Sequence, residues 1–261
     1  MPSYVYGEPY KDLAYKITIS RPEKLNAIND EMWDALAKEL DRGCSTELKS
    51  ILLTGTESAF SSGDDIDAMY RLYTPEEAKG FFEKIYNVFT AMSSCHKPIV
   101  CAVKGLAAGG GAELLLACDI VVAAENSWIS FPEVALGLIP PFLLGVGTRA
   151  LGYRRARYLA MSGRRLSASE AAVLGIVDEV VPQSDVDQTV DDILSTLVSF
   201  PDEALESIKK FTQRDIDAKA VREVIDRLAE LVLTRDAKER MELFKSRKLK
   251  PAAVRGERKA Q

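Results

Sequence analysis

The order of hydrophobic patterns in the first half of the chain is the feature that most limits the fold. Between residues 12 and 125, short apolar segments rich in β-branched residues alternate with longer segments of helical periodicity. The expected strands are residues 12–20, 49–55, 98–105 and 119–125, and the expected helices are residues 29–43, 75–95 and 109–118. Alternating strands and helices build a buried, largely parallel sheet with crossover helices. The sequence therefore predicts an α/β core.

The second half of the chain changes character, because the strand signal fades beyond about residue 134. A capped helix followed by a short strand is expected within residues 167–182, and residues 183–248 have a helical pattern almost throughout. We therefore expect an α/β core in residues 1–200 and a helical C-terminal region in residues 201–261. The C-terminal helices carry apolar residues that we expect to pack between subunits: Leu205, Ile208, Phe211, Val224, Ile225, Leu228, Leu231, Val232 and Leu243.

Composition argues against several classes of function. A formal net charge of −5 disfavours nucleic acid as the main partner. The sequence has no apolar run near 18 residues and no signal-like N-terminus, which predicts a cytoplasmic protein without a membrane span. The single histidine, His96, argues against a Ser-His-Asp triad and a histidine-rich metal site. The four cysteines form no C-x-x-C pattern, and we expect them to be reduced thiols.

Two loops share one pattern, in which a strand leads through small residues and glycine into a helix. The first loop is AFSSGDDIDAMY (59–70), and the second is LAAGGGAELLLACD (106–119). Helix N-termini carry unpaired N–H groups, and glycine allows the backbone to approach a ligand closely. Two such loops on neighbouring strands would each point one N–H at the same oxygen, which stabilises an enolate or a tetrahedral oxyanion. The alternative, that the glycines only permit tight helix–strand packing, stays open.

Two glutamates stand in apolar surroundings near these loops. Glu113 follows the triple glycine, and Glu133 lies in SWISFPEVALGLIP after a proline that indicates a turn. Either residue alone would be read as a salt-bridged structural glutamate. Together, beside a glycine-rich helix start, they favour a pair of acid–base groups, because desolvation raises carboxyl pKa values towards neutral pH.

The chain resembles the enoyl-CoA hydratase/isomerase (crotonase) superfamily over nearly its whole length, and most closely an enoyl-CoA hydratase. The resemblance is carried by four segments in the order and spacing of that family: RPEKLNAIND, AFSSGDDIDAM, KPIVCAVKGLAAGGGAELLLACDIVVAAENSWISFPEVALGLIP and GYRRARYLAMSGRRLSASEAAVLGIVDEVVP. It implies a spiral of ββα units with a helical C-terminal trimerisation region, and a homotrimer or a dimer of trimers. It also implies acyl-CoA thioester substrates with no metal and no further cofactor, since coenzyme A is part of the substrate.

The resemblance assigns the reacting groups position by position. Asp64 and Gly110 match the two residues whose backbone N–H groups hold the thioester oxygen. Glu113 matches the glutamate that activates water in the hydratases. Glu133 matches the glutamate that exchanges the proton at the α-carbon. These four residues form the expected catalytic site.

The resemblance also implies a binding site for coenzyme A. The segment RPEKLNAI matches the part of the family that lines this site. The residues implied as contacts are Lys24, Leu25 and Ala27, together with Ser62, Asp65 and Ile66 near the adenine and pantetheine. Lys24 is equally well explained as a solvated loop lysine, and that alternative stays open.

Three positions depart from the common family pattern. Asp64 stands where many relatives carry a small or neutral residue, so its side chain must point away from a developing negative charge. The stretch PPFLLGVGTRALG (140–152) is longer and bulkier than its counterpart, which affects the expected acyl pocket. The motif GDDID is acidic for a site near an anionic ligand, so we expect basic groups to come from elsewhere, such as KSRKLK (245–250).

Hydration of a 2-enoyl-CoA thioester to a 3-hydroxyacyl-CoA is the expected function. Within the superfamily the alternatives are Δ3–Δ2 enoyl-CoA isomerase, acyl-CoA hydrolase and decarboxylase, and Glu113 favours hydration because isomerases typically keep only the second glutamate. An RNA-binding relative is disfavoured because helix 29–43 has more acidic than basic residues. A non-catalytic scaffold is disfavoured by the presence of both Glu113 and Glu133.

Overall fold

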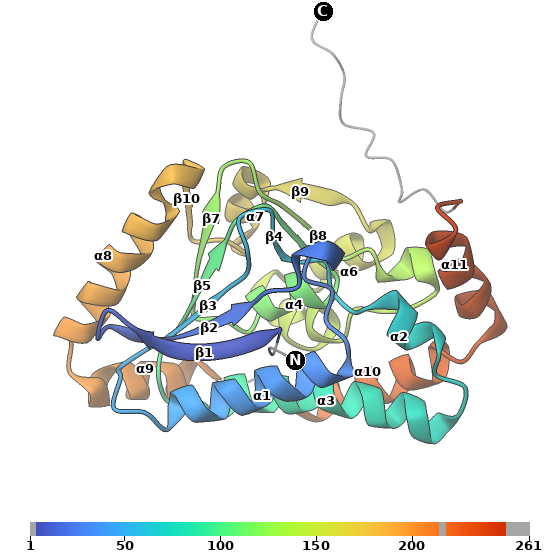
Figure 1. Cartoon of the computed structure of the whole chain (residues 1–261), viewed down its shortest axis with the longest axis horizontal. Helices are drawn as coiled ribbons and strands as arrows, with labels where there is room; N and C mark the ends of the chain where they lie inside the picture. The colour runs from blue at the N-terminus through green and yellow to red at the C-terminus, as the bar shows by residue number, and fades with distance from the viewer. Residues whose placement is uncertain (1–3, 214–217, 249–261) are drawn as a thin grey trace, which may run out of the picture.

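A six-stranded sheet forms the larger of two sheets in the computed structural model, which describes residues 4–213 and 218–248 (Figure 1). Its strand order is β1-β2-β3-β5-β7-β10. The first pair, β1 and β2, is antiparallel, and the pairs from β2 onward are parallel. The strands are β1 (Val5–Tyr10), β2 (Ala14–Ile19), β3 (Ile51–Thr54), β5 (Ile99–Val103), β7 (Ile120–Ala124) and β10 (Glu179–Val181). The predicted parallel sheet is thus confirmed.

A smaller sheet of short strands, in the order β4-β6-β8-β9, was not predicted from the residue pattern. Strands β4, β6 and β8 are parallel to one another, and β9 is antiparallel to β8. The four strands are β4 (Ala59–Ser61), β6 (Leu106–Ala108), β8 (Trp128–Ser130) and β9 (Arg165–Ser167). Strands of three residues are too short to show a period of two, which is why the pattern missed them.

The two sheets are linked by a repeated unit of two strands and a helical segment. A strand of the larger sheet leads directly into a strand of the smaller sheet, and a helix or helical turn follows. The units are β3–β4 with α2 (Ile66–Tyr70) and α3 (Pro75–Ser94), β5–β6 with α4 (Gly110–Leu115), and β7–β8 with the 3-10 turn η2 (Glu133–Leu136). This arrangement confirms the α/β spiral of ββα units that the family resemblance implies.

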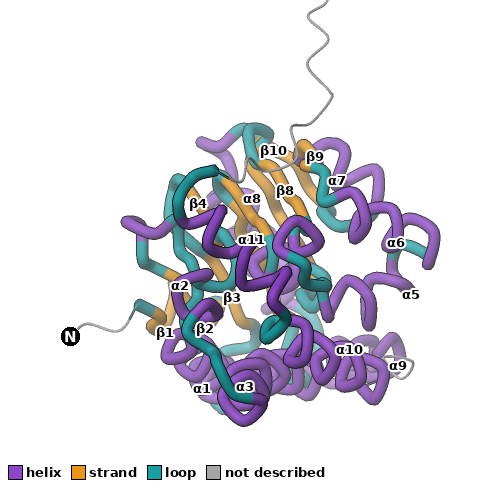
Figure 2. Tube along the Cα trace, turned by 90° about the vertical axis from the view of Figure 1, so that its right-hand side faces the viewer, coloured by secondary structure: helices purple, strands orange, loops and turns teal. Residues whose placement is uncertain are grey.

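Helix α1 (Asp30–Cys44) forms as its sequence predicts. The Asn29 side chain accepts a hydrogen bond from the backbone N–H of Met32 at 3.0 Å, which caps the first turn. The apolar face of α1 buries Trp33 and Leu36 fully. Helices α1, α3 and α10 (Ala218–Leu231) pack together as a layer beside the sheets (Figures 1 and 2).

Helix α8 (Val186–Ser199) covers the other face of the larger sheet. Its residues Val190 and Leu194 pack in one apolar cluster with Leu52 of β3 and Val100 of β5. The sheet is therefore apolar on both faces, as expected for a parallel sheet between helical layers.

The remaining regular elements of the described chain are helical, and those beyond residue 182 confirm the helical pattern predicted for residues 183–248, of which residues 214–217 lie outside the described part. The remaining helices are α5 (Thr148–Ala150), α6 (Tyr153–Ser162), α7 (Ala168–Leu174), α9 (Asp202–Gln213) and α11 (Arg235–Lys245), with helical turns η1 (Pro22–Lys24), η3 (Leu143–Gly147) and η4 (Gln183–Asp185).

One expectation for the C-terminal helices is partly wrong. Ile225, Leu228 and Val232 were expected to pack between subunits, but they are buried in the main core of their own chain. The reason is that α10 lies against α3, so its apolar face is covered within the chain. Ile208 and Phe211 on α9 are exposed, at 62% and 59%.

The cysteines also differ from expectation, because Cys44 and Cys95 are joined in a disulfide with their Cα atoms 5.8 Å apart. The two residues are 51 positions apart in sequence and meet because α1 and α3 lie side by side and both end at this place. Cys101 and Cys118 are free thiols. Among the described helices, none combines the length and the apolar character that crossing a membrane requires.

Candidate active site

Three carboxyl groups line one cavity of about 270 Å³ beside the smaller sheet. Asp64 follows β4, Glu113 lies on α4 after β6, and Glu133 begins η2 after β8. Because β4, β6 and β8 are adjacent and parallel, their carboxyl ends meet at the same edge of the sheet. The structure therefore brings together the two loops and the two glutamates that the sequence singled out.

The two glycine-containing loops touch each other through their main chains. Gly63 has a φ of +90°, and a Cβ atom there would lie 2.7 Å from the Ala108 carbonyl oxygen and 2.9 Å from the Gly110 nitrogen. A side chain at this position would push the loops apart, so glycine is required both for its conformation and for the close approach. The Gly109 N–H donates to the Ser130 carbonyl at 3.0 Å, which ties the second loop to β8.

The N–H groups of Asp64 and Gly110 donate to no backbone carbonyl of the described chain. The Ile28 N–H donates to the Gly63 carbonyl, and the Asp65 N–H donates to the Ile28 carbonyl. These two bonds form a parallel bridge that does not use the Asp64 N–H. Gly110 is the first residue of α4, where an N–H has no partner within the helix. Within the described chain, neither group is therefore used by the backbone, although the Asp64 N–H lies close enough to its own carboxyl group to stabilise the charge there.

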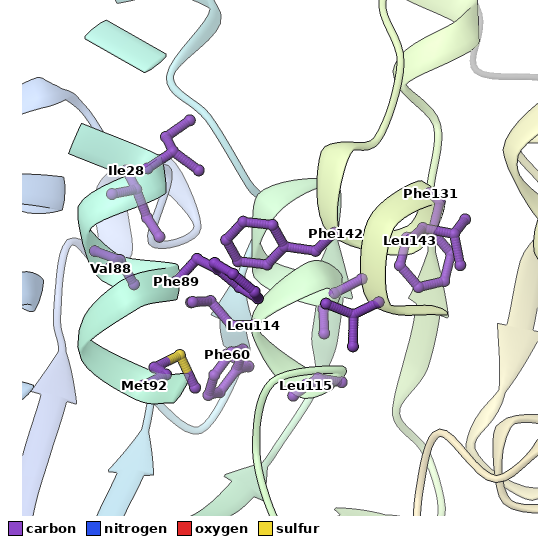
Figure 3. Packing of buried hydrophobic residues seen from close by; sticks show 14 of the residues in the cluster. Ile28, Phe60, Val88, Phe89, Met92, Leu114, Leu115, Phe131, Phe142 and Leu143 are labelled. Carbon is purple, nitrogen blue, oxygen red and sulfur yellow. The ribbon is translucent and has the colours of Figure 1, made fainter. Parts of the chain in front are cut away.

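Glu113 is buried, with 3% of its surface exposed, and is held by two backbone donors. Its Oε1 accepts hydrogen bonds from the N–H groups of Phe142 at 2.7 Å and Leu143 at 3.0 Å. These N–H groups lie in the first turn of the helical segment that starts after Pro140, and the Phe142 ring packs against Phe89 of α3 with centroids 5.0 Å apart (Figure 3). Sequence reasoning missed these donors, although the proline pair 140–141 is a recognisable helix-start signal.

Glu133 is buried with both carboxyl oxygens lacking a hydrogen-bond partner in the described chain. The pKa of Glu133 is raised to about 8, mainly by burial and also by the nearby Asp64 carboxyl, while its own backbone N–H acts in the opposite direction. A buried polar group without a partner is uncommon in a folded protein. Both oxygens are thus free to exchange a proton with a molecule in the cavity.

The pKa of Glu113 is also raised, but a different set of interactions acts on it. Burial raises its pKa well above the usual carboxyl range, and the negative charges of Glu133 and Asp64 act in the same direction. The hydrogen bonds from Leu143 and Phe142 oppose the shift, because they stabilise the ionised form. When one proton is shared by the two glutamates, these donors favour the charge on Glu113.

The Asp64 side chain stays inside the cavity instead of pointing away from it. Its Oδ1 accepts a hydrogen bond from the indole Nε1–H of Trp33 at 2.9 Å. The pKa of Asp64 is raised to about 6 by burial, although the hydrogen bond from Trp33 and the Asp64 backbone N–H both act in the opposite direction. Trp33 is a fully buried residue of α1, and its contact with the site is a result of the tertiary structure.

The residues expected to bind coenzyme A divide into two groups. Leu25, Ser62 and Ile66 line the cavity. Lys24 lies outside the lining, where its Nζ is 2.9 Å from Asp67 Oδ2, and Lys245 of α11 approaches Oδ1 of the same carboxylate at 3.3 Å. The two lysines therefore converge on one carboxylate beside the cavity. Residues 249 and 250 of the basic KSRKLK segment lie outside the described part of the chain.

Ala27 and Asp65 also lie outside the cavity lining, where both contact Arg21. The Arg21 guanidinium donates to the Ala27 carbonyl at 3.1 Å and to Asp65 Oδ2 at 2.6 Å. Asp65 also caps α2, since its Oδ1 accepts from the Asp67 N–H at 2.8 Å. These contacts stabilise the first loop.

Comparison with known proteins identifies the family of the chain. A family model described as enoyl-CoA hydratase/isomerase matches residues 11–250. The chain belongs to the enoyl-CoA hydratase/isomerase family. Among curated relatives, the short-chain-enoyl-CoA hydratase of Clostridium acetobutylicum is 33% identical over 241 residues, which are 87% of this chain and 89% of that protein. A probable enoyl-CoA hydratase of Mycobacterium leprae is 31% identical over 210 residues, which cover 77% of this chain and 78% of that protein.

Solved structures of this family share the fold along almost the entire chain. An enoyl-CoA hydratase from Mycobacterium avium subsp. paratuberculosis superposes with a TM-score of 0.84 at 25% identity, covering 95% of this chain and 98% of that chain. An enoyl-CoA hydratase/isomerase from Pseudoalteromonas atlantica superposes with a TM-score of 0.81 at 27% identity, covering 94% and 97%. The α/β spiral is therefore the fold of this family.

Proposed function

We propose that this family member hydrates a 2-enoyl-CoA thioester to a 3-hydroxyacyl-CoA. The observation that carries the proposal is the placement of Glu113 and Glu133 in one buried cavity next to the N–H groups of Asp64 and Gly110, which donate to no backbone carbonyl of the described chain. Paired carboxyls with raised pKa values suit proton transfer near neutral pH. Two backbone donors suit the charge that develops on the thioester oxygen.

The two glutamates have different roles in the proposed reaction, and their hydrogen bonds determine which role each one takes. Glu113, favoured as the carboxylate, takes a proton from water while the water oxygen bonds to C3 of the enoyl group. The electrons of the C2–C3 double bond move towards the thioester oxygen, which the N–H groups of Asp64 and Gly110 hold. Glu133, favoured as the neutral acid, gives its proton to C2. One water is added, and the proton gained by Glu113 replaces the one lost by Glu133 through solvent exchange.

Substrate binding follows from the cavity lining and the charges beside it. Most of the lining side chains are apolar, which suits an acyl chain. Leu25 lines the cavity and is about half exposed, so it lies where the cavity opens to solvent. Lys24 and Lys245 supply positive charge on this side. We assign the phosphates of coenzyme A to these two lysines, with Asp67 keeping them in place.

Assembly into a homotrimer or a dimer of trimers belongs to the same proposal. It is supported by apolar side chains that remain exposed on the chain surface, among them Ile208, Met161 and Phe200. Light scattering at micromolar concentration is expected to give a mass of three or six chains. A monomer at that concentration would contradict this part of the proposal.

A panel of acyl-CoA substrates tests the proposed reaction. Loss of the conjugated thioester absorbance is followed with 2-enoyl-CoA substrates of different length and branching, and gain of that absorbance is followed with a 3-enoyl-CoA of matched length. Hydration of at least one 2-enoyl-CoA, with slower conversion of the 3-enoyl-CoA, is the expected result. Efficient conversion of the 3-enoyl-CoA alone would instead identify an isomerase.

A further inference from the structure

Asp64 brings a third carboxyl group to the cavity, and the reaction proposed above uses only its backbone N–H. The side chain is fixed at one end, since Oδ1 accepts the hydrogen bond from Trp33 Nε1 at 2.9 Å. Its other end is next to the second loop, because a Cβ atom placed on Gly110 would lie 3.3 Å from Oδ2. The carboxyl group thus lies beside both N–H groups that are assigned to the thioester oxygen.

The charges around Asp64 are negative. Glu113 on α4 and Glu133 on η2 face it across the cavity, and each has its pKa raised by the Asp64 charge. Asp65 is its sequence neighbour, and the Arg21 guanidinium next to that neighbour pairs with Asp65 at 2.6 Å. Among the described residues, no lysine, arginine or histidine forms an ion pair with the Asp64 carboxyl. An ionised Asp64 would therefore repel an enolate that forms beside it.

A neutral Asp64 changes this repulsion into an attraction. An indole N–H only donates, so Oδ1 must accept the hydrogen bond from Trp33. The proton of the neutral acid then sits on Oδ2, the oxygen that faces Gly110. A carboxylic acid kept neutral by its surroundings is an effective donor to a developing oxyanion.

We propose that Asp64 is a catalytic residue that works as the neutral acid, donating a third hydrogen bond from Oδ2 to the thioester oxygen while Trp33 positions its Oδ1. The proposal rests on the proposed function in one respect, because it takes an acyl-CoA thioester as the ligand. It assigns a role to the Asp64 side chain, which the proposed reaction leaves unused. Burial raises the pKa of Asp64 to about 6, so most of the free protein must gain this proton at neutral pH.

Binding of a saturated acyl-CoA separates proton uptake from chemistry. Butyryl-CoA has no double bond to hydrate, and its affinity is measured by calorimetry at pH 7.5 in two buffers of different ionisation enthalpy. The wild-type protein is expected to take up about one proton more on binding than the Asp64→Asn variant. Asparagine is the matched control, because its amide oxygen accepts from Trp33 and its NH2 group is a permanent donor.

The outcomes of the calorimetric experiment are distinct. Equal proton uptake by the wild type and D64N would overturn the role of Asp64 and leave the hydratase proposal intact. Failure of both proteins to bind butyryl-CoA would overturn the proposed function and the role of Asp64 with it.

Kinetics provide a second test with the same pair of proteins. The ratio of kcat/KM for D64N to that of the wild type is expected to rise about tenfold per pH unit above pH 6, since only the wild type loses the donor proton. Glu113 and Glu133 are present in both proteins, so their titrations largely cancel in the ratio. A ratio that stays constant from pH 6 to pH 8 would overturn the proposal.

Trp33→Phe tests the positioning residue with Asp64 intact. The Trp33 hydrogen bond lowers the pKa of Asp64, so its removal raises that pKa. The alkaline fall of kcat/KM should therefore move to higher pH in W33F. A purely structural role for Trp33 would lower activity equally at every pH, and that result would also count against the proposal.

Discussion

Glu113 and Glu133 lie in the same cavity, but their carboxyl groups differ in their hydrogen-bond partners. Glu113 accepts two backbone hydrogen bonds from Phe142 and Leu143, which lie at a helix start. Glu133 has two oxygens and no partner in the described chain. Burial raises both pKa values, but Glu113 has two donors from another segment that favour its charged form, whereas Glu133 has only its own backbone N–H. The difference teaches that two buried carboxyls in one cavity are distinguished by the backbone donors that reach them.

The largest expected effect comes from replacing the glutamates one at a time. Glu133→Gln should abolish both hydration and exchange of the α-protons of a saturated acyl-CoA, because no other group is assigned to the α-carbon. Glu113→Gln should reduce hydration by about 10²–10⁴-fold but leave part of the exchange, which needs only Glu133 and the oxyanion donors. Hydration is followed by absorbance and exchange by NMR in D2O. Wild-type hydration by E113Q would make Glu113 structural and favour an isomerase.

A change in the oxyanion-binding loop, on which the reactions of both glutamates depend, should affect hydration and α-proton exchange equally. A Cβ atom on Gly110 would lie 3.1 Å from Trp33 and 3.3 Å from Asp64 Oδ2, so Gly110→Val crowds the loop and displaces its N–H. Loss of one such donor costs about 3 kcal/mol in the transition state, or about a hundredfold in kcat. Hydration and exchange should fall together. A folded G110V variant with wild-type turnover would contradict the assignment of this loop.

The unpaired state of Glu133 should also be visible as a pH-dependent loss of stability. Its pKa is raised from 4.5 to about 8, so the folded protein keeps a proton that the unfolded chain releases between these values. Stability therefore falls as the pH rises through this window. Glu133→Gln removes the effect and should raise the melting temperature at pH 8 by about 10 °C relative to wild type, since each kcal/mol is worth about 2–4 °C in a chain of this size.

The control for this stability prediction is an exposed carboxyl. Glu203→Gln on α9 changes the same functional group at an exposed position. Its melting temperature should follow that of the wild type from pH 5 to pH 8, measured by calorimetry. If E133Q and E203Q shift equally, the buried carboxyl has no special effect on stability.

The smallest effect on activity should come from the disulfide, which touches neither glutamate. Cys44 and Cys95 close a loop with a sequence separation of 51, and a crosslink of that span stabilises the folded state by about 4 kcal/mol. Reduction, or Cys44→Ser, should lower the melting temperature by several degrees and leave kcat unchanged. The C44S variant itself should not respond to reductant. A wild-type melting temperature that is insensitive to reductant would contradict the prediction.

The extent to which sequence predicted structure depended on the length of each element. Residues 29–43 and 75–95 show several turns of helical periodicity, and both helices form within one or two residues of the predicted ends. Strands β4, β6 and β8 have three residues each, which is too short for a period to be read. The apolar face of α10 was read correctly as buried but assigned to the wrong partner, because periodicity does not identify what covers a face.

The sequence by itself determined the α/β class, the two glycine loops and the choice of Glu113 and Glu133, because turn chemistry and isolated carboxyls in apolar segments are local signals. Only the tertiary structure decided that Phe142 and Leu143 hold Glu113, that Trp33 holds Asp64, and that Cys44 meets Cys95. Those contacts join residues 29 to 51 positions apart. Their partners are set by how helices and strands pack in space, and no local pattern along the chain records that packing.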